Sequence, residues 1–215
     1  MNELKGKVAI VTGASKGIGA AIARQFAKAG AAVVVNYASS KDDADRVVGG
    51  ILRDGGKAVA IQADVSKSAD VKRLFAETRA AFGSPNILVN NAGVYRFGSL
   101  EEATEAEFHR QFDTNVLSTI LTTQEAARAF DGPGGSVINL SSISSANPVP
   151  NSVIYSASKA AVDTVTDDLV LTDETDVNRY LDLYARLQEA AMSPGDSLDY
   201  LATTAEEIRR TIHNG

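Results

Sequence analysis

Residues 8–19 have the sequence Val8-Ala-Ile-Val-Thr-Gly-Ala-Ser-Lys-Gly-Ile-Gly19. The first five, Val8–Thr12, are mostly apolar and rich in β-branched side chains, which is typical of a strand buried on both faces. A loop with the spacing Gly-x-x-x-Gly-x-Gly follows, and then a helical pattern from Ala20 to Ala29 that Gly30 ends. Strand, glycine loop and helix together indicate a site for a dinucleotide pyrophosphate. Glycines let the anion approach the backbone, and the helix N-terminus supplies free N–H groups.

The alternation of strands and helices continues to about Thr166. Further strands are expected at Ala32–Tyr37, Lys57–Gln62, Ile87–Asn90 and Val137–Ser141, and helices at Asp42–Arg53, Val71–Phe82 and Glu102–Phe130. This pattern predicts an α/β fold: a Rossmann-like, doubly wound parallel sheet of about five strands with helices on both faces. Because ligands of such sheets bind at the carboxyl ends of the strands, the segments that follow the strands form the candidate site.

The end of the second expected strand is where a residue that contacts the cofactor ribose should lie. An acidic residue there would bond the 2′-hydroxyl of NAD(H) and repel the 2′-phosphate of NADP(H). Here Tyr37 is followed by Ser39, Ser40 and Lys41, and Lys16 lies in the glycine loop. Two cations and no carboxylate at this corner favour NADP(H) over NAD(H). The alternative is that both lysines are merely exposed.

Polar and small residues follow the third and fourth expected strands. Asp64 could accept a hydrogen bond from the exocyclic amine of adenine, or could cap the helix that begins near Ser68. In Asn90-Asn-Ala-Gly93, the asparagines can tie neighbouring strand ends together, and the two small residues leave room for a flat ligand. Asn115 lies within the long helical pattern, where a buried amide is costly unless it is hydrogen-bonded.

Tyr155 and Lys159 lie four residues apart in a helical pattern, with Ser142 thirteen residues before the tyrosine. Residues i and i+4 share a helix face, so the phenol and the ammonium can point at the same place. A cation there favours the phenolate and makes Tyr155 a proton donor and acceptor nearer neutral pH. Ser142 is expected at the end of the fifth strand, with its hydroxyl free to bond a substrate oxygen. Taken alone, the Tyr-x-x-x-Lys pattern is more often a solvated helix face.

The composition argues against several other kinds of protein. With 44% hydrophobic and 22% charged residues among 215, the chain has the composition of a globular protein with one well-buried core. It has no cysteine, its only histidines are His109 and His213, and no metal site is expected. The net charge of −6 argues against nucleic acid as a partner. We expect no membrane span and no signal peptide, and therefore a cytoplasmic location.

Together and in this order, the motifs resemble those of the short-chain dehydrogenase/reductase family over residues 5–166. The resemblance is carried by Thr12-Gly13, Gly17-Ile-Gly19, Asp64, Asn90-Asn-Ala-Gly93, Asn115, Ser142 and Tyr155-x-x-x-Lys159. It implies an NADP(H)-dependent oxidoreductase that transfers hydride between the nicotinamide and a carbonyl or alcohol carbon. It also implies a small-molecule substrate and a homo-oligomer, either a dimer or a tetramer. Residues 35–40 resemble NADPH-preferring reductases of the 3-oxoacyl and polyhydroxyarene type.

The same resemblance implies roles for individual residues. Tyr155 would be the general acid or base, Lys159 would hold the nicotinamide ribose, Ser142 would polarise the substrate oxygen, and Asn115 would keep a water for the proton relay. The cofactor-binding residues that it implies are Gly13, Ser15, Lys16, Gly17, Ile18, Gly19, Tyr37, Ser39, Ser40, Asp64, Val65, Asn91, Ala92, Gly93, Tyr155 and Lys159.

The sequence departs from that family after Thr166. Members of that family usually continue with a sixth strand, a Pro-Gly turn, a substrate lid and a last strand. The sequence after Thr166 predicts none of these elements. Residues 167–215 carry 11 acidic and 4 basic side chains, whereas residues 1–166 carry 16 and 17. The apolar spacing predicts an acidic helical hairpin, faintly similar to the C-terminal end of the sensing region in some bacterial helix-turn-helix regulators. The sequence therefore predicts a catalytic domain at 1–166 and an atypical tail at 167–215.

An alternative function follows from this departure. The chain could be a catalytically impaired dinucleotide-binding module, or a truncated or hybrid chain, whose helical tail mediates association or regulation. Without a sixth strand, the fifth strand would lie at the edge of the sheet with unpaired backbone groups. Turnover of a carbonyl substrate with NADPH separates the enzyme from the binding module.

Overall fold

The computed structural model describes residues 3–131 and 134–167. The chain divides into two compact units, Met1–Thr172 and Asp173–Gly215, and all the described residues belong to the first. The helical hairpin expected in the tail lies outside the described residues, and the boundary expected after residue 166 stays a prediction.

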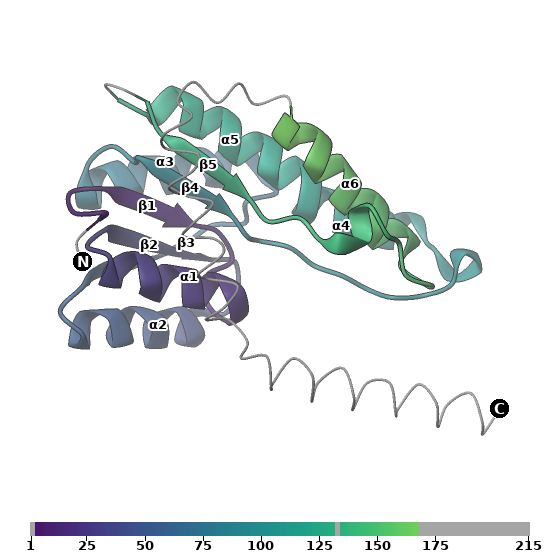
Figure 1. Cartoon of the computed structure of the whole chain (residues 1–215), viewed down its shortest axis with the longest axis horizontal. Helices are drawn as coiled ribbons and strands as arrows, with labels where there is room; N and C mark the ends of the chain where they lie inside the picture. Colours follow the sequence, from purple (N-terminus) through teal and green to yellow (C-terminus); the bar gives the residue numbers. More distant parts are fainter. Residues whose placement is uncertain (1–2, 132–133, 168–215) are drawn as a thin grey trace. The chain divides into compact units, whose positions relative to one another are not determined.

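The described residues form one five-stranded parallel sheet (Figure 1). Its strands are β1 (Val8–Val11), β2 (Ala32–Tyr37), β3 (Lys57–Gln62), β4 (Ile87–Asn90) and β5 (Ser136–Asn139). The order across the sheet is β3-β2-β1-β4-β5, and each of the four pairings is parallel. The chain thus builds outward from β1 to one edge and then returns to build β4 and β5 on the other side. This reversal confirms the doubly wound fold and marks the place where such sheets bind ligands.

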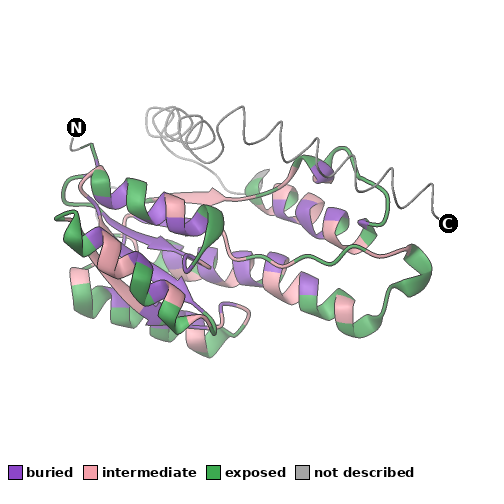
Figure 2. Ribbon diagram, turned by 90° about the horizontal axis from the view of Figure 1, so that it is seen from below, coloured by how far each residue is buried: buried purple, intermediate pink, exposed green. Residues whose placement is uncertain are grey.

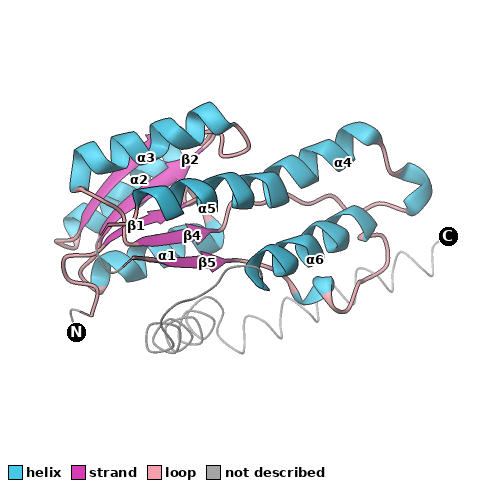
Figure 3. Ribbon diagram, turned by 90° about the horizontal axis from the view of Figure 1, so that it is seen from above, coloured by secondary structure: helices cyan, strands magenta, loops and turns pink. Residues whose placement is uncertain are grey.

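Helices cover both faces of the sheet. Those longer than one turn are α1 (Gly17–Lys28), α2 (Lys41–Arg53), α3 (Ser68–Phe82), α4 (Glu105–Phe112), α5 (Ser118–Ala129) and α6 (Val153–Asp167). Figure 1 shows α1 and α2 along one face and α3 and α5 along the other, with α6 beside α5. Figure 3 shows α4 and α5 almost end to end, so that α4 projects past the carboxyl ends of the strands with α6 next to it.

The core lies between the central strands and the helices that cover them. Ile10, Val34 and Leu88 are neighbours across β1, β2 and β4, and all three are fully buried. Leu74 of α3 and Ala126 of α5 pack in the same cluster. Figure 2 shows the buried residues concentrated in the strands and on the helix faces turned toward the sheet. Because both faces are covered, the strands need continuous apolar sequence, which is the pattern that predicted them.

The long helix expected at Glu102–Phe130 is largely confirmed, because residues 105–129 are continuously helical, but it begins at Glu105 and contains a π-helical turn. The segment consists of a 3₁₀ turn (Leu100–Glu102), α4, a π-helical turn (Asp113–Leu117) and α5. Helix α4 has its own N-cap, Thr104, whose Oγ1 accepts a hydrogen bond from the N–H of Glu107 at 3.2 Å. The π-helical turn contains Asn115, whose side chain bonds outside the helix, and such single turns often mark functional positions.

Candidate functional site

The three glycines of the motif, one in the turn after β1 and two in the first turn of α1, are required for different physical reasons. Gly13 has a φ of 61°, and a Cβ there would lie 2.9 Å from Ala92 Cα. A Cβ on Gly19 would collide with Asn91 Nδ2 and lie 2.8 Å from Gly13 O. Gly17 has a φ of 58° but open space at its Cβ position. Packing against the segment after β4 therefore requires Gly13 and Gly19, whereas backbone conformation requires Gly17.

The N-terminus of α1 is open to an external anion. Its N-cap residue, Lys16, makes no capping side-chain hydrogen bond to the described residues, and the first turn holds no acidic residue. Helices α2 and α3 differ, because Asp42 and Asp43 lie in the first turn of one and Asp70 in that of the other. The positive end of α1 thus lacks an internal counter-charge, which fits a dinucleotide pyrophosphate. Of the loop's other implicated residues, Ser15 is buried and Ile18 is exposed.

Asparagines join neighbouring strand ends, as the sequence predicts. Asn91 Nδ2 donates to the carbonyl oxygens of Thr12 and Gly13, at 2.8 and 3.1 Å. On the other side of β4, Asn90 Nδ2 donates to Asn139 Oδ1 at 2.8 Å. The Thr12 hydroxyl also accepts hydrogen bonds from the N–H groups of Asn91 and the following Ala92, both at 3.0 Å. These bonds fix the glycine loop against the segment after β4.

Lys16 and Lys41 both lie at the corner beyond β2, but carboxylates lie there too. Lys16 Nζ is 4.0 Å from Asp43 Oδ2, and Lys41 Nζ is 2.5 Å from Asp45 Oδ2. Asp43 also pairs with Arg46. The expectation of a corner without a carboxylate is therefore wrong, because the beginning of α2 places Asp43 close to Lys16 and Asp45 close to Lys41. Both lysine side chains remain mostly exposed, 72% and 67%, and so remain accessible to a ligand.

The other residues implicated near the ribose and the adenine differ in accessibility. Tyr37 is only 9% exposed, so most of its ring packs inside the protein. Ser39 is exposed, and the half-buried Ser40 is the N-cap of α2 without a capping side-chain bond to the described residues. Val65 is buried in the core cluster. Of these four side chains, those of the two serines are the ones that a ligand could reach without rearrangement.

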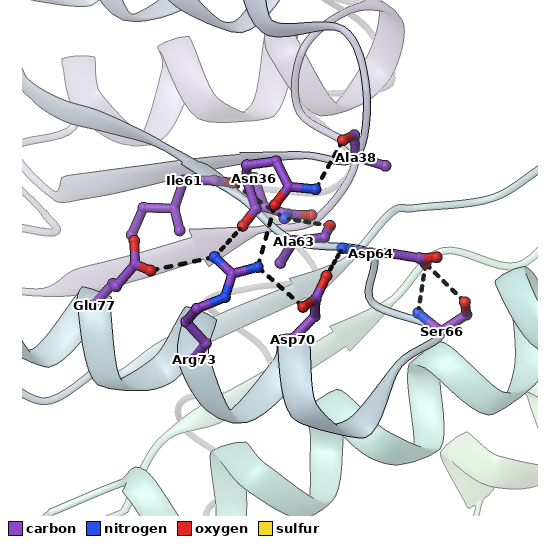
Figure 4. Close-up of polar contacts among 10 residues, drawn as sticks. Asn36, Ala38, Ile61, Ala63, Asp64, Ser66, Asp70, Arg73 and Glu77 are labelled. Atoms are coloured by element: carbon purple, nitrogen blue, oxygen red, sulfur yellow. Dashed lines mark hydrogen bonds and ion pairs between the residues drawn. The ribbon is translucent and has the colours of Figure 1, made fainter.

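Asp64 closes a turn before α3 and does not cap the helix itself (Figure 4). Its Oδ1 accepts from the N–H and the hydroxyl of Ser66, at 3.1 and 2.7 Å. Its own N–H donates to Asp70 Oδ2 at 2.8 Å, and that bond lowers the pKa of Asp70. Asn36 Nδ2 donates to Ala63 O at 3.1 Å and so joins the ends of β2 and β3. The helix begins at Ser68, as expected, and of the two alternatives for Asp64 the helix-capping one is wrong, whereas the adenine contact stays a prediction.

Tyr155 and Lys159 lie one turn apart on α6, and the lysine is inside the protein. Lys159 Nζ is 6.0 Å from the centroid of the Tyr155 ring and donates a hydrogen bond to Leu140 O at 2.8 Å. Lys159 is 6% exposed, and this burial lowers the pKa of its ammonium group, while nearby Asp163 acts in the opposite direction. The pattern is therefore not a solvated helix face.

Gly93 and Asn115 approach Lys159 from the segment after β4 and from the π-helical turn. A Cβ on Gly93 would lie 3.4 Å from Asn115 Oδ1 and 3.7 Å from Lys159 Nζ. Asn115 is 1% exposed, and its Nδ2 donates to Ser158 Oγ and to Val94 O, both at 2.9 Å. The expectation that this buried amide is hydrogen-bonded is confirmed. The fold brings these residues together from separate parts of the chain.

Ser142 lies beyond the end of β5, which stops at Asn139 and not at the expected Ser141. Its Oγ accepts from the N–H of Ser144 at 3.2 Å and lies 2.9 Å from Ser144 Oγ. Ser142 is the N-cap of the turn Ile143–Ser145, and the expectation that its hydroxyl is free to bond a substrate oxygen stays a prediction. When Ser144 Oγ is the donor, the Ser142 proton can still be given to a second acceptor.

Two aromatic residues next to Tyr155 were missed by the sequence analysis. Tyr95 and Phe97 have ring centroids 6.1 and 6.2 Å from that of Tyr155, and both meet its ring edge to face. The available signal was a pair of aromatic residues two positions apart, the first of them two positions after Gly93. That signal does not show that the loop returns to α6.

A cavity of about 1170 Å³ lies at the opposite end of the sheet and belongs to none of these motifs. Its walls include Lys7, Ala32 and Lys57, at the amino ends of three strands, and no implicated site residue lines it. Within residues 3–131 and 134–167, no group of His, Cys, Asp or Glu side chains is placed to hold a metal ion. No helix in this part of the chain combines the length and the apolarity needed to cross a membrane.

Comparisons with known proteins indicate the family. The family described as short chain dehydrogenase matches residues 7–177. An uncharacterized oxidoreductase of Methylorubrum extorquens is 52% identical over 166 residues, which are 77% of this chain and 66% of that protein. Elsinochrome reductase 1 of Elsinoe fawcettii is 44% identical over 164 residues, which are 76% of this chain and 61% of that protein.

A solved structure shares the fold. The crystal structure of a short chain dehydrogenase from Burkholderia cenocepacia in complex with NADP has a TM-score of 0.71 and 41% sequence identity. The match covers 75% of this chain and 66% of that one. The chain thus spans between 61% and 66% of the length of these three proteins.

Proposed function

The chain belongs to the short-chain dehydrogenase family, and on that premise we propose that it is an NADP(H)-dependent oxidoreductase. In the proposed reaction, hydride passes between the nicotinamide and a carbonyl or alcohol carbon, and Tyr155 gives or takes the proton at the oxygen. Similarity to proteins named oxidoreductase and reductase supports this class of activity and favours the carbonyl-reducing direction. The binding-module alternative has no comparable support.

The observation that carries the proposal is the buried ammonium group of Lys159 beside the Tyr155 ring. A buried ammonium is costly, and perturbed buried charges concentrate at functional sites. The ammonium group lies 6.0 Å from the ring centroid, so a positive charge stands beside the ring that gives up its proton in the proposed reaction. Tyr155 then gives its proton to the substrate oxygen as the carbon gains hydride, and the resulting phenolate is held by Lys159 until a proton returns.

We propose that the cofactor lies along the carboxyl ends of β1, β2 and β4. NADP(H) supplies or removes the hydride when bound. The open N-terminus of α1 supports a pyrophosphate at the glycine loop, and Gly93 supports a nicotinamide near Asn115 and Lys159. By the family resemblance, Asp64 and Val65 lie at the adenine, and Ser39 and Ser40 at its ribose. Ser142 would donate to the substrate oxygen, and Asn115 would hold a water.

The preference for NADP(H) over NAD(H) is a finer part of the same proposal. Lys16 supports it, because its exposed ammonium group lies at the corner where the 2′-phosphate would lie. The NADP complex of the Burkholderia relative agrees with this assignment. Asp43 opposes it, since its carboxylate is 4.0 Å from Lys16 Nζ and would repel the phosphate. We assign the preference mainly to Lys16 and not to Lys41, because the Lys41 ammonium group is already paired with Asp45 at 2.5 Å, whereas Lys16 is 4.0 Å from Asp43.

The test is the variant Tyr155→Phe, followed by NADPH oxidation with a reactive 1,2-diketone. We expect kcat to fall by about 10² to 10⁴, the usual contribution of a general acid, with NADPH binding unchanged in a nicotinamide fluorescence titration. Thr164→Val is the control, because it removes an exposed hydroxyl from the same helix two turns later. Unchanged turnover in Tyr155→Phe, or no binding of NADPH to the parent protein, would overturn the proposal.

We also propose that the protein forms a homo-oligomer. An apolar groove of about 320 Å³ between α4 and α6, lined by residues that include Leu100, Phe112 and Val153, supports an interface there. Size-exclusion chromatography with light scattering checks the mass, and a monomer at micromolar concentration would contradict this part.

A further inference from the structure

The segment from Val94 to Phe97 places two exposed aromatic rings against the proposed proton donor. Tyr95 is 66% exposed and Phe97 is 52% exposed, although both pack on Tyr155. The interplanar angles with the Tyr155 ring are 66° and 79°, so both contacts are edge to face. Tyr95 and Phe97 also contact each other, with centroids 5.5 Å apart. We call these two rings the aromatic wall.

The backbone of this segment is anchored at three successive carbonyl groups. Asn115 Nδ2 donates to Val94 O at 2.9 Å, an Arg110 N–H donates to Tyr95 O at 3.2 Å, and Gln111 Nε2 donates to Arg96 O at 3.4 Å. These three donors come from α4 and the π-helical turn. A short loop with this many external donors has little freedom, so the rings it carries are preorganised.

Four further hydrogen bonds support this segment and its anchors. Glu107 accepts three hydrogen bonds, from Arg110 Nε and an Arg110 terminal nitrogen at 2.9 and 2.7 Å and from Gln111 Nε2 at 2.8 Å. At the far end of the segment, the N–H of Gly98 donates to Asn151 O at 2.7 Å. Asn151 has a φ of 62°, a left-handed conformation that asparagine tolerates better than most residues. The loop is thus held at both ends.

The geometry points to a planar aromatic carbonyl compound as the substrate class, with the ring system of the substrate packed on Tyr95 and Phe97. Exposed aromatic side chains held rigidly beside a reactive group contribute little to the core, because much of their surface stays in water. They offer π faces and edges to a ligand ring, and aromatic contacts gain more than area burial alone provides. A saturated ring of the same size gains only the area. This inference rests on the proposed function, because it names the substrate of the same site.

The test compares 1-tetralone with 1-decalone, two bicyclic ketones that differ in one aromatic ring. We measure kcat/KM for both with NADPH and take the ratio, so that the intrinsic reactivity of each ketone cancels between variants. We expect the ratio to fall about threefold to tenfold in Tyr95→Leu and in Phe97→Leu, mainly through KM, and further in the double variant. A ratio that is unchanged in the folded double variant would overturn the inference.

Phe108→Leu is the matched control. Phe108 is 43% exposed on α4, close to the 52% of Phe97, but its ring stacks on Phe112 and not on Tyr155. We expect the ratio for this variant to stay within about twofold of the parent. An equal fall in the control would also overturn the inference, since it would trace the effect to general loss of aromatic surface.

A binding measurement separates this inference from the proposed function. Isothermal titration calorimetry with 1-naphthol and 1-decalol needs no turnover. Suppose that the parent protein reduces neither ketone but binds 1-naphthol more tightly than 1-decalol, and that the double variant loses this difference. Such a result would support the role of the aromatic wall in binding and would contradict the proposed oxidoreductase function. Equal or no binding of the two alcohols to the parent overturns the aromatic wall.

Discussion

Asn115 and Val94 make a two-point contact. Asn115 Oδ1 accepts from the N–H of Val94 at 2.8 Å, and Asn115 Nδ2 donates to Val94 O at 2.9 Å. The side-chain amide of Asn115 thus pairs both the backbone N–H and the backbone carbonyl of Val94, as a neighbouring strand would within the sheet. The segment after β4 leaves the sheet and still keeps its backbone groups paired, which allows it to reach Lys159 and Tyr155.

We expect Asn115→Ala to lower the free energy of unfolding by about 2 to 4 kcal/mol, because both backbone groups of Val94 and the Ser158 hydroxyl lose a partner. Urea denaturation checks the value. Asn147→Ala is the control, since Asn147 is exposed and such substitutions change stability by about 0.5 kcal/mol or less. Equal effects of the two substitutions would contradict the structural role of Asn115.

Two helical glycines should respond oppositely to alanine. A Cβ on Gly19 would meet Asn91 Nδ2 and Gly13 O, so Gly19→Ala should cost about 1 to 3 kcal/mol and weaken cofactor binding. Gly49, inside α2, has nothing within 4 Å of its Cβ position, so Gly49→Ala should stabilise the protein by about 0.5 to 1 kcal/mol. Thermal melts of both variants check the signs. A stabilised Gly19→Ala variant would show that the loop does not pack as described.

Charge substitutions at the corner beyond β2 should distinguish the two lysines. Lys16→Ala should weaken NADPH binding roughly fivefold and leave NADH binding nearly unchanged, because only NADPH carries the 2′-phosphate. Lys41→Ala should have a smaller effect, since its ammonium group already bonds Asp45. Asp43→Asn should tighten NADPH binding by about twofold to fivefold. Fluorescence titrations with both cofactors check this order, and equal losses for NADPH and NADH in Lys16→Ala would refute it.

The network around Glu107 should make stability sensitive to acid. Hydrogen bonds from Arg110 and Gln111 lower the pKa of Glu107 from 4.5 to about 2. Because the pKa in the folded state lies below that of the unfolded state, the contribution of Glu107 is complete above pH 4.5 and is lost as the pH falls toward 2. Denaturation between pH 6 and about 2.5 should therefore show a steeper acid loss in the parent than in Glu107→Gln.

The control for this pH dependence is Glu125→Gln. Glu125 pairs with Arg128 three residues away, and that pair anchors no loop. We expect its acid loss to parallel that of the parent. If Glu107→Gln also parallels the parent, then Glu107 does not retain its low pKa in the folded protein.

The sequence alone determined the sheet and most of the residues that gather at its carboxyl end. Strands β2, β3 and β4 begin and end at the predicted residues. For the buried strands β2 and β4 the reason is that a strand covered on both faces needs continuous apolar sequence and its neighbours in the chain do not. The glycine loop and the pair Tyr155 and Lys159 were identified for a similar reason, since local spacing alone puts their groups together.

Only the tertiary structure decided how those groups are surrounded. It brought Asp43 to Lys16, engaged the Ser142 hydroxyl with Ser144, began the expected long helix at Glu105 and put a π-helical turn inside it. It also brought Tyr95 and Phe97 to Tyr155, across nearly 60 residues of chain. These contacts depend on where helices and loops meet after the sheet has assembled. Periodicity and spacing describe neighbours within one element, and so they cannot show contacts between elements.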